Sequence, residues 1–149
     1  MTEPNDPLSL AELSCFTVYS AAHAFTAAYK PLLEPLGLTY PQYLVLIVLW
    51  GQDGLMVKEI GARLQLDSGT LTPILKRLEA SGYIRRTRLP ENQRQLRVEL
   101  TDSGRALRSK ALVLRESLGC AIGGSVERIR ETKHGLEEII RSLRPSPSS

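Results

Sequence analysis

The segment from Ser68 to Gly82 restricts the fold of this chain most strongly, because it is a predicted helix whose two sides have different requirements. On one side apolar residues recur at the i, i+3, i+4, i+7 spacing of a helix that buries one face: Leu71, Ile74, Leu75 and Leu78. The other side carries small hydroxyl groups and then cations: Ser68, Thr70, Thr72, Lys76 and Arg77. Such side chains suit contacts with base edges and phosphates in a major groove. Taken alone, this segment fits an ordinary solvated helix face better, since amphipathic helices are common.

The preceding residues favour the nucleic-acid interpretation. The sequence VKEIGARL, residues 57–64, predicts a second short amphipathic helix. Residues 65–67 then have the length of the turn in a helix-turn-helix motif. Asp67 is expected to cap the start of the following helix, and Gly82 to end it in a left-handed conformation.

A basic β-hairpin is predicted after these two helices. Residues 83–88 and 96–100 alternate with period two, and a polar tip at residues 90–94 joins them. Between positions 76 and 97 seven cations face only Glu79 and Glu91, although the whole chain has a net charge of only +3. The pattern predicts a winged helix-turn-helix that binds double-stranded DNA. The expected DNA-binding residues are Asp67, Ser68, Thr70, Thr72, Lys76, Arg77, Arg86, Arg88 and Arg94.

Pro73 conflicts with a regular helix at this place. Proline lacks an N–H group and its ring crowds the carbonyl four residues earlier. We therefore expect the helix either to begin after Ser68 or to bend at Pro73.

The remaining sequence is predicted to be helical. A first helix is expected from Leu8 until Pro31 ends it, and a second from Tyr40 to Gly51. The second is apolar on nearly all sides and is expected at the centre of the fold. Two further helices are expected at residues 104–118, capped by residues 101–103, and at residues 125–143, with Gly119, Gly123 and Gly124 interrupting them.

Length and composition bound the architecture. A chain of 149 residues that is 42% hydrophobic suffices for one core. We expect a mainly α single domain with a small β-hairpin, in which residues 53–101 form the winged helix-turn-helix and residues 8–52 and 102–144 form helices for dimerisation. The terminal helices carry more apolar surface than one compact domain needs, which predicts a twofold homodimer. Such a dimer requires an inverted-repeat DNA site with half-sites about 34–36 Å apart or a multiple of that spacing.

Several classes of protein are not expected. No apolar run approaches the roughly 18 residues that span a bilayer, and the N-terminal residues do not form a secretory signal, so we expect no membrane partner and a cytoplasmic protein. Two cysteines and two histidines are too few for a typical zinc site, and no catalytic set accompanies them. No metal, cofactor or enzymatic activity is predicted.

The order of elements and the motifs LTYPQY, LDSGTLTPILKRLE and LTDSG resemble the MarR family of bacterial regulators, and the resemblance extends over residues 8–143. The sequences CF, YKPLL and LDSGTLTP resemble more narrowly its organic-hydroperoxide-sensing repressors. This resemblance implies that Cys15 is the peroxide-reactive thiol and that Tyr29 and Tyr40 hydrogen-bond to it, with Tyr19 as a third polar contact. It also implies that Cys120 forms a disulfide with Cys15 of the other subunit.

One position departs from this family. Its members commonly carry an Asp two residues before the wing-tip arginine, whereas Asn92 precedes Arg94 here. The resemblance implies a minor-groove role for Arg94. The Asn92 amide carries no charge, so it cannot orient the Arg94 side chain through an ion pair.

The chemistry expected at Cys15 is oxidation of a thiolate. Donated hydrogen bonds from tyrosines favour the charged form of a thiol. A peroxide then gives a sulfenic acid, which a second thiol converts to a disulfide. The glycines near Cys120 are expected to let it approach its partner. Spacing alone leaves open that Cys15 and Cys120 are small buried hydrophobic residues.

Two other functions share part of this pattern. A thiol peroxidase would use the same cysteine chemistry but would not need the basic hairpin. A MarR-type repressor that responds to a reversible phenolic ligand would keep the DNA-binding region and would release DNA without a thiol.

Overall fold

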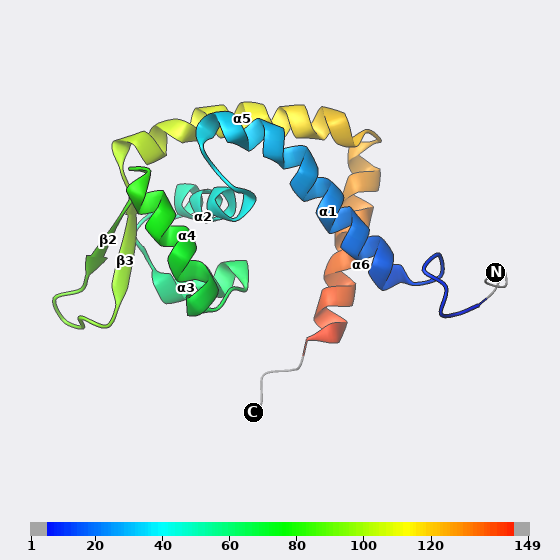
Figure 1. Cartoon of the computed structure of the whole chain (residues 1–149), viewed down its shortest axis with the longest axis horizontal. Helices are drawn as coiled ribbons and strands as arrows, with labels where there is room; N and C mark the ends of the chain where they lie inside the picture. Colours follow the sequence, from blue (N-terminus) through cyan, green and yellow to red (C-terminus); the bar gives the residue numbers. More distant parts are fainter. Residues whose placement is uncertain (1–5, 145–149) are drawn as a thin grey trace. The chain divides into compact units, whose positions relative to one another are not determined.

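The computed structural model describes residues 6–144, which form six α-helices, one 3-10 turn and three short strands. Packing divides the chain into two compact units that meet between Leu114 and Arg115, and each is described by itself. In chain order (Figure 1) the elements are α1 (Ser14–Leu33), η1 (Glu34–Leu36), α2 (Tyr40–Gly51), β1 (Leu55–Met56), α3 (Val57–Leu64), α4 (Ser68–Ala80), β2 (Ile84–Arg88), β3 (Leu96–Leu100), α5 (Asp102–Ile122) and α6 (Val126–Leu143). The predicted fold class, mainly α with a winged helix-turn-helix, is confirmed.

The hairpin forms as predicted and gains a third strand. β2 and β3 pair antiparallel, with Ile84 opposite Leu100 and Arg88 opposite Leu96. β1 pairs with the other edge of β3, which gives the order β1-β3-β2. A strand of two residues carries no periodic signal, so the sequence did not predict β1.

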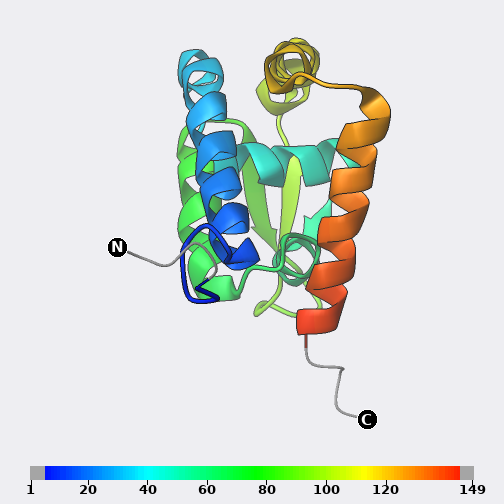
Figure 2. The same cartoon turned by 90° about the vertical axis from the view of Figure 1, so that its right-hand side faces the viewer.

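One hydrophobic core supports the helix-turn-helix. α2 packs against α3 and α4 (Figures 1 and 2), in agreement with the central position predicted for it. The least exposed side chains come from these helices and the sheet, and include Leu46, Leu49, Ile60, Leu71, Leu75, Leu78, Ile84 and Val98. The apolar side predicted for α4 is therefore the side that faces the core.

The ends of α4 are fixed by local chemistry. The Asp67 carboxylate accepts a hydrogen bond from the Thr70 N–H (2.7 Å) and caps the first turn. At the other end Gly82 has a φ of 81°, its N–H donates to the Glu79 carbonyl, and the Tyr83 N–H donates to the Leu78 carbonyl. This is a Schellman motif, so both predicted ends are confirmed.

Pro73 does not delay the start of α4. The helix begins at Ser68 and continues through Pro73 to Ala80, so of the two expected alternatives the later start is wrong. Proline at the sixth helical position forgoes one hydrogen bond, to the Gly69 carbonyl. The capped first turn and the three buried leucines stabilise the helix on both sides of that position.

The predicted limits of α1 are also wrong. The helix starts at Ser14, not Leu8, because the residues before it form turns in which the Ser9 N–H donates to the Asp6 carbonyl (2.9 Å). It continues past Pro31 to Leu33. Pro31 forgoes its own hydrogen bond, to the Ala27 carbonyl, and the helix continues only two residues beyond it.

α5 is longer than predicted and includes Gly119 and Cys120. Glycine within a helix costs only about 1 kcal/mol, and the helix instead ends before Gly123 and Gly124, whose φ values are 68° and 92°. Cys120 thus lies in the last turn of a helix and not in the flexible glycine segment that the sequence suggested. α6 begins at Val126, one residue after the predicted start, because Ser125 forms its cap.

Membrane-spanning length was tested on the described residues. No single helix among residues 6–144 is long and apolar enough to cross a bilayer, and only the bent pair of residues 14–36 and Tyr40–Gly51, at 73° to each other, reaches the required length and composition together.

Candidate DNA interface and thiol site

The polar side of α4 is open to solvent. Ser68, Thr70, Lys76 and Arg77 are exposed, and Thr72 is half-buried. The Thr72 hydroxyl donates to the Ser68 carbonyl (2.7 Å), which leaves its oxygen available as an acceptor. The structure therefore brings the predicted hydroxyl groups and cations together on one side of α4, opposite the buried leucines.

Asp67 stabilises the helix start. The Thr70 N–H, followed by the Thr70 hydroxyl, holds the pKa of the Asp67 carboxyl below its ordinary value. The carboxylate is thus occupied by the cap, and its charge would repel a phosphate. Its contribution to the interface is to support the helix that carries Ser68 and Thr70.

A groove of about 530 Å³ lies between the start of α3, α4 and the hairpin. Ser68 and Thr72 line it from α4, and Arg86 and Arg94 line it from the hairpin. It also contains residues that the sequence analysis did not single out, among them Lys58 at the start of α3 and Gln95 in the wing. Only the tertiary arrangement brings these two to the groove, because neither stands out in its local sequence.

Arg86 braces the wing against α4. Its backbone N–H donates to Glu79 Oε2 (2.8 Å) and its guanidinium lies 3.1 Å from Glu79 Oε1. The hydrogen bond from this backbone N–H, and to a smaller extent the guanidinium, lowers the pKa of Glu79 below its ordinary value. Arg86 lines the groove, and its charge is paired with Glu79, one of the two acidic residues that the sequence places among the cations.

The wing tip is organised by Asn92. Its Oδ1 accepts a hydrogen bond from the Arg94 N–H (3.1 Å), and its carbonyl accepts one from the Gln95 N–H. Arg88 reaches the same turn and donates to the Gln93 carbonyl (2.6 Å). The amide thus fixes the backbone that carries Arg94, while the Arg94 side chain stays exposed.

Cys15 is a free, exposed thiol in the first turn of α1. Tyr19 lies one turn further on, with its ring 6.4 Å from Phe16 and 4.4 Å from His23. Tyr29 and Tyr40 have ring centroids 4.9 Å apart, and Tyr43 packs on both. We call this group, at the turn between α1 and α2, the tyrosine corner.

The tyrosine corner is remote from the thiol of its own chain. Cys15 and Tyr29 are 14 positions apart on one continuous helix, which separates them by about 21 Å along the helix axis at 1.5 Å per residue. One chain therefore brings Tyr29 and Tyr40 together but does not bring them to its own Cys15.

Cys120 is likewise free and exposed. It belongs to the unit that starts at Arg115, whereas Cys15 belongs to the unit that ends at Leu114. Within residues 6–144 no group of three or more His, Cys, Asp or Glu side chains is arranged to hold a metal ion.

The fold and the basic groove define a winged-helix DNA-binding regulator. Residues 38–96 match the model of the MarR family. The chain is 55% identical to the HTH-type transcriptional regulator TtmR of Methylorubrum extorquens, over 96% of this chain and 71% of that protein. It is 40% identical to the organic hydroperoxide resistance transcriptional regulator of Bacillus subtilis, over 93% of this chain and 94% of that protein.

A solved structure gives the same result. AbfR of Staphylococcus epidermidis, in its reduced form bound to DNA, has a TM-score of 0.80 and 37% identity over 90% of this chain and 92% of that one. A disulfide form of AbfR has a TM-score of 0.67 and 36% identity, over 88% of this chain and 92% of that one. The chain belongs to the MarR family of transcriptional regulators.

Proposed function

We propose that this protein is a homodimeric repressor that binds inverted-repeat DNA and releases it when an organic hydroperoxide oxidises Cys15. The observation that carries the proposal is the separation of the thiol from the tyrosine corner within one chain, combined with the exposed apolar surface of α1. The Bacillus relative is named for organic hydroperoxide resistance, and AbfR has been solved both reduced on DNA and with a disulfide, which supports the same chemistry.

A second copy of the chain is the natural cover for the terminal helices. α1 buries only Leu33 of its 20 residues, and α6 buries none of its 18. Apolar side chains such as Tyr19 (62% exposed), Ile139 (47%) and Leu143 (78%) are left at the surface. Exposed apolar surface of this extent marks an interface. Twofold pairing would present α4 of each copy, which we call the recognition helix, to DNA.

The same pairing would complete the sensor. Tyr29 and Tyr40 of one copy would donate hydrogen bonds to Cys15 of the other, because the intact helix keeps them from the thiol of their own chain. Such bonds favour the thiolate, which is the nucleophilic form of cysteine. Phe16 and the tyrosine rings would supply an apolar surround suited to the organic part of the peroxide.

The proposed reaction has two steps. The Cys15 thiolate attacks the terminal peroxide oxygen, the O–O bond breaks, and the products are a Cys15 sulfenic acid and, after protonation of the leaving alkoxide, an alcohol. The Cys120 thiolate of the second copy then attacks the sulfenic sulfur, so that the S–S bond forms, the S–O bond breaks, and the hydroxide that leaves takes up a proton from solvent to become water.

An operator-binding titration of reduced protein, with and without cumene hydroperoxide, tests the proposal. We expect peroxide to release DNA from the parent and a dithiol reductant to restore binding. Cys15→Ser should bind DNA and ignore peroxide. Release from Cys15→Ser would contradict the thiol mechanism and would favour a ligand-responsive repressor.

The same titration followed on a non-reducing gel tests the role of Cys120. The parent should form a covalent dimer after peroxide, whereas Cys120→Ser should not. A parent that releases DNA yet runs only as a monomer would assign resolution to an external thiol.

A further inference from the structure

The turn that carries the tyrosine corner is tied to a residue far along the chain. The Tyr83 hydroxyl donates a hydrogen bond to the carbonyl of Leu36 (3.0 Å). Leu36 ends η1, the short turn between the helix that carries Tyr29 and the helix that begins with Tyr40. Tyr83 and Leu36 are both partly buried, so water competes only weakly for this hydrogen bond.

The backbone of the same residue closes the recognition helix. The Tyr83 N–H donates to the Leu78 carbonyl (3.1 Å) in the motif that ends α4. The Tyr83 carbonyl accepts from the Thr101 N–H (3.0 Å), where β3 passes into α5. Tyr83 is thus bonded to the turn beside the tyrosine corner, to the end of α4 and to the start of α5.

The junction around Tyr83 is packed too closely to adjust freely. A Cβ added at Gly104 would lie 2.1 Å from the Tyr83 carbonyl oxygen, so only glycine allows α5 to approach this closely. The Thr101 hydroxyl donates to the Gly82 carbonyl and caps α5 at the Gly104 N–H. The glycine at position 104 therefore lets the first turn of α5 lie directly against the Tyr83 carbonyl.

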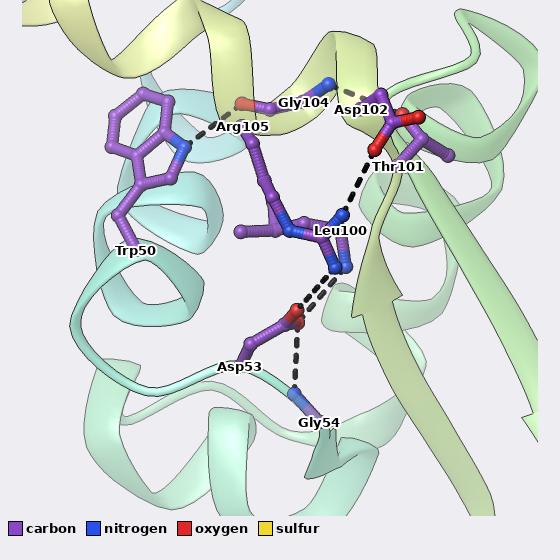
Figure 3. A network of polar contacts seen from close by, with 8 residues as sticks. All are labelled: Trp50, Asp53, Gly54, Leu100, Thr101, Asp102, Gly104 and Arg105. Carbon is purple, nitrogen blue, oxygen red and sulfur yellow. Dashed lines mark hydrogen bonds and ion pairs between the residues drawn. The ribbon is translucent and has the colours of Figure 1, made fainter.

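A second contact leads from the tyrosine corner to the same junction. Tyr43 packs against Trp50 with ring centroids 6.4 Å apart. The Trp50 Nε1 donates in turn to the Gly104 carbonyl (2.9 Å), as Figure 3 shows. Removal of the Tyr83 hydroxyl would thus leave α2 attached to the start of α5 and the core intact.

From these contacts we infer that Tyr83 is a positioning residue that couples the state of the tyrosine corner to the placement of the recognition helix. The inference rests on the proposed function, since it requires that oxidation of Cys15 in one copy alters the tyrosine corner of the other copy. Coupling between sites requires an element whose position both sites influence. Tyr83 meets this requirement because its side chain is bonded to the turn beside the tyrosine corner and its backbone is bonded to the end of the recognition helix.

The test measures operator dissociation constants of the full-length dimer, reduced and after treatment with cumene hydroperoxide, for the parent, Tyr83→Phe and Thr101→Val. The readout is the ratio of the oxidised to the reduced constant. Tyr83→Phe removes only the hydroxyl that reaches Leu36. Thr101→Val removes a hydroxyl at the same junction that does not contact the corner.

We expect Tyr83→Phe to reduce the ratio about fivefold, the equivalent of one net hydrogen bond, and Thr101→Val to lower thermal stability with the parental ratio retained. A parental ratio in Tyr83→Phe, or an equal loss in Thr101→Val, would overturn the inference while the proposed function stands. A parent ratio of one would defeat both.

Discussion

The recognition helix and the terminal helices differ in how much of their environment comes from their own chain. α4 buries Leu71, Leu75 and Leu78, has a cap at each end, and is braced to the wing by the Arg86–Glu79 ion pair. α1 and α6 together bury only Leu33. The DNA-binding region is therefore packed within one chain, whereas α1 and α6 leave their apolar faces exposed, and in the proposed dimer a second copy covers them.

The largest effect is expected from a charge on the exposed stripe of α6. Ile140→Asp should dissociate the dimer without unfolding the chain, because a carboxylate buried in the pairing surface without a partner costs about 3–5 kcal/mol. Sedimentation velocity should give a monomer, and circular dichroism should give the parental helix content. Ser142→Asp places the same charge towards the polar side of α6 and should stay dimeric. A dimeric Ile140→Asp would refute the assignment of this surface.

A truncation in the core of the recognition helix should have the opposite signature. Leu75→Ala should lower the free energy of unfolding by about 2–5 kcal/mol, through lost burial and the cavity that remains. Urea denaturation measures this loss, and sedimentation should still give a dimer. A loss below about 1 kcal/mol would mean that α4 is held by something other than its leucines.

A smaller effect is expected at the helix cap. Asp67→Ala should lower the melting temperature because the Thr70 N–H loses its acceptor, and Asp67→Asn should retain most of the stability because an amide oxygen can also cap a helix. Equal melting temperatures for the parent and Asp67→Ala would show that the cap contributes nothing.

The smallest effect concerns acid stability. Hydrogen bonds from Arg86 lower the pKa of Glu79 below its ordinary value of 4.5. A lowered carboxyl pKa stabilises the folded state above the unfolded-state value, and this contribution is lost as the pH falls from near 4.5 through the folded value. The effect should be modest, since the Glu79 side chain is 37% exposed and the pair is screened by water.

Urea midpoints at neutral pH and below pH 4 check this sign. Compared with the parent, Glu79→Gln should have a lower urea midpoint at neutral pH. Its midpoints at neutral pH and below pH 4 should therefore differ less than those of the parent. A difference as large as that of the parent would place the acid sensitivity at another carboxyl group.

The parts of the fold that sequence could predict are those fixed by nearby residues. Asp67, the leucine spacing and Gly82 define α4 within 16 positions, and period-two alternation defines the hairpin. β1 escaped prediction because it exists only through pairing with β3. The Cys120 segment was wrongly assigned to a flexible linker because Gly119 was taken as a break, whereas the helix continues through it.

The candidate site divides in the same way. The composition of the polar side of α4 was visible in the sequence, but the pairing of Arg86 with Glu79 and the bond from Tyr83 to Leu36 join positions 7 and 47 apart and depend on the folded chain. Tyr29 and Tyr40 were predicted as site residues only because the sequence resembles a known family. The continuity of α1 shows that they lie far from the thiol of their own chain, and this distance supports the proposal that they act on Cys15 of another copy.

A mixed dimer tests this central claim most directly. In a Cys120→Ser background, one subunit would carry Cys15→Ser and the other would carry Tyr29→Phe and Tyr40→Phe, so that a single thiol remains. If the tyrosines act across the dimer, this thiol meets intact tyrosines from its partner and should react with cumene hydroperoxide at the rate of the Cys120→Ser dimer. Reaction at the slower rate of the dimer with both tyrosines replaced in both subunits would contradict the account.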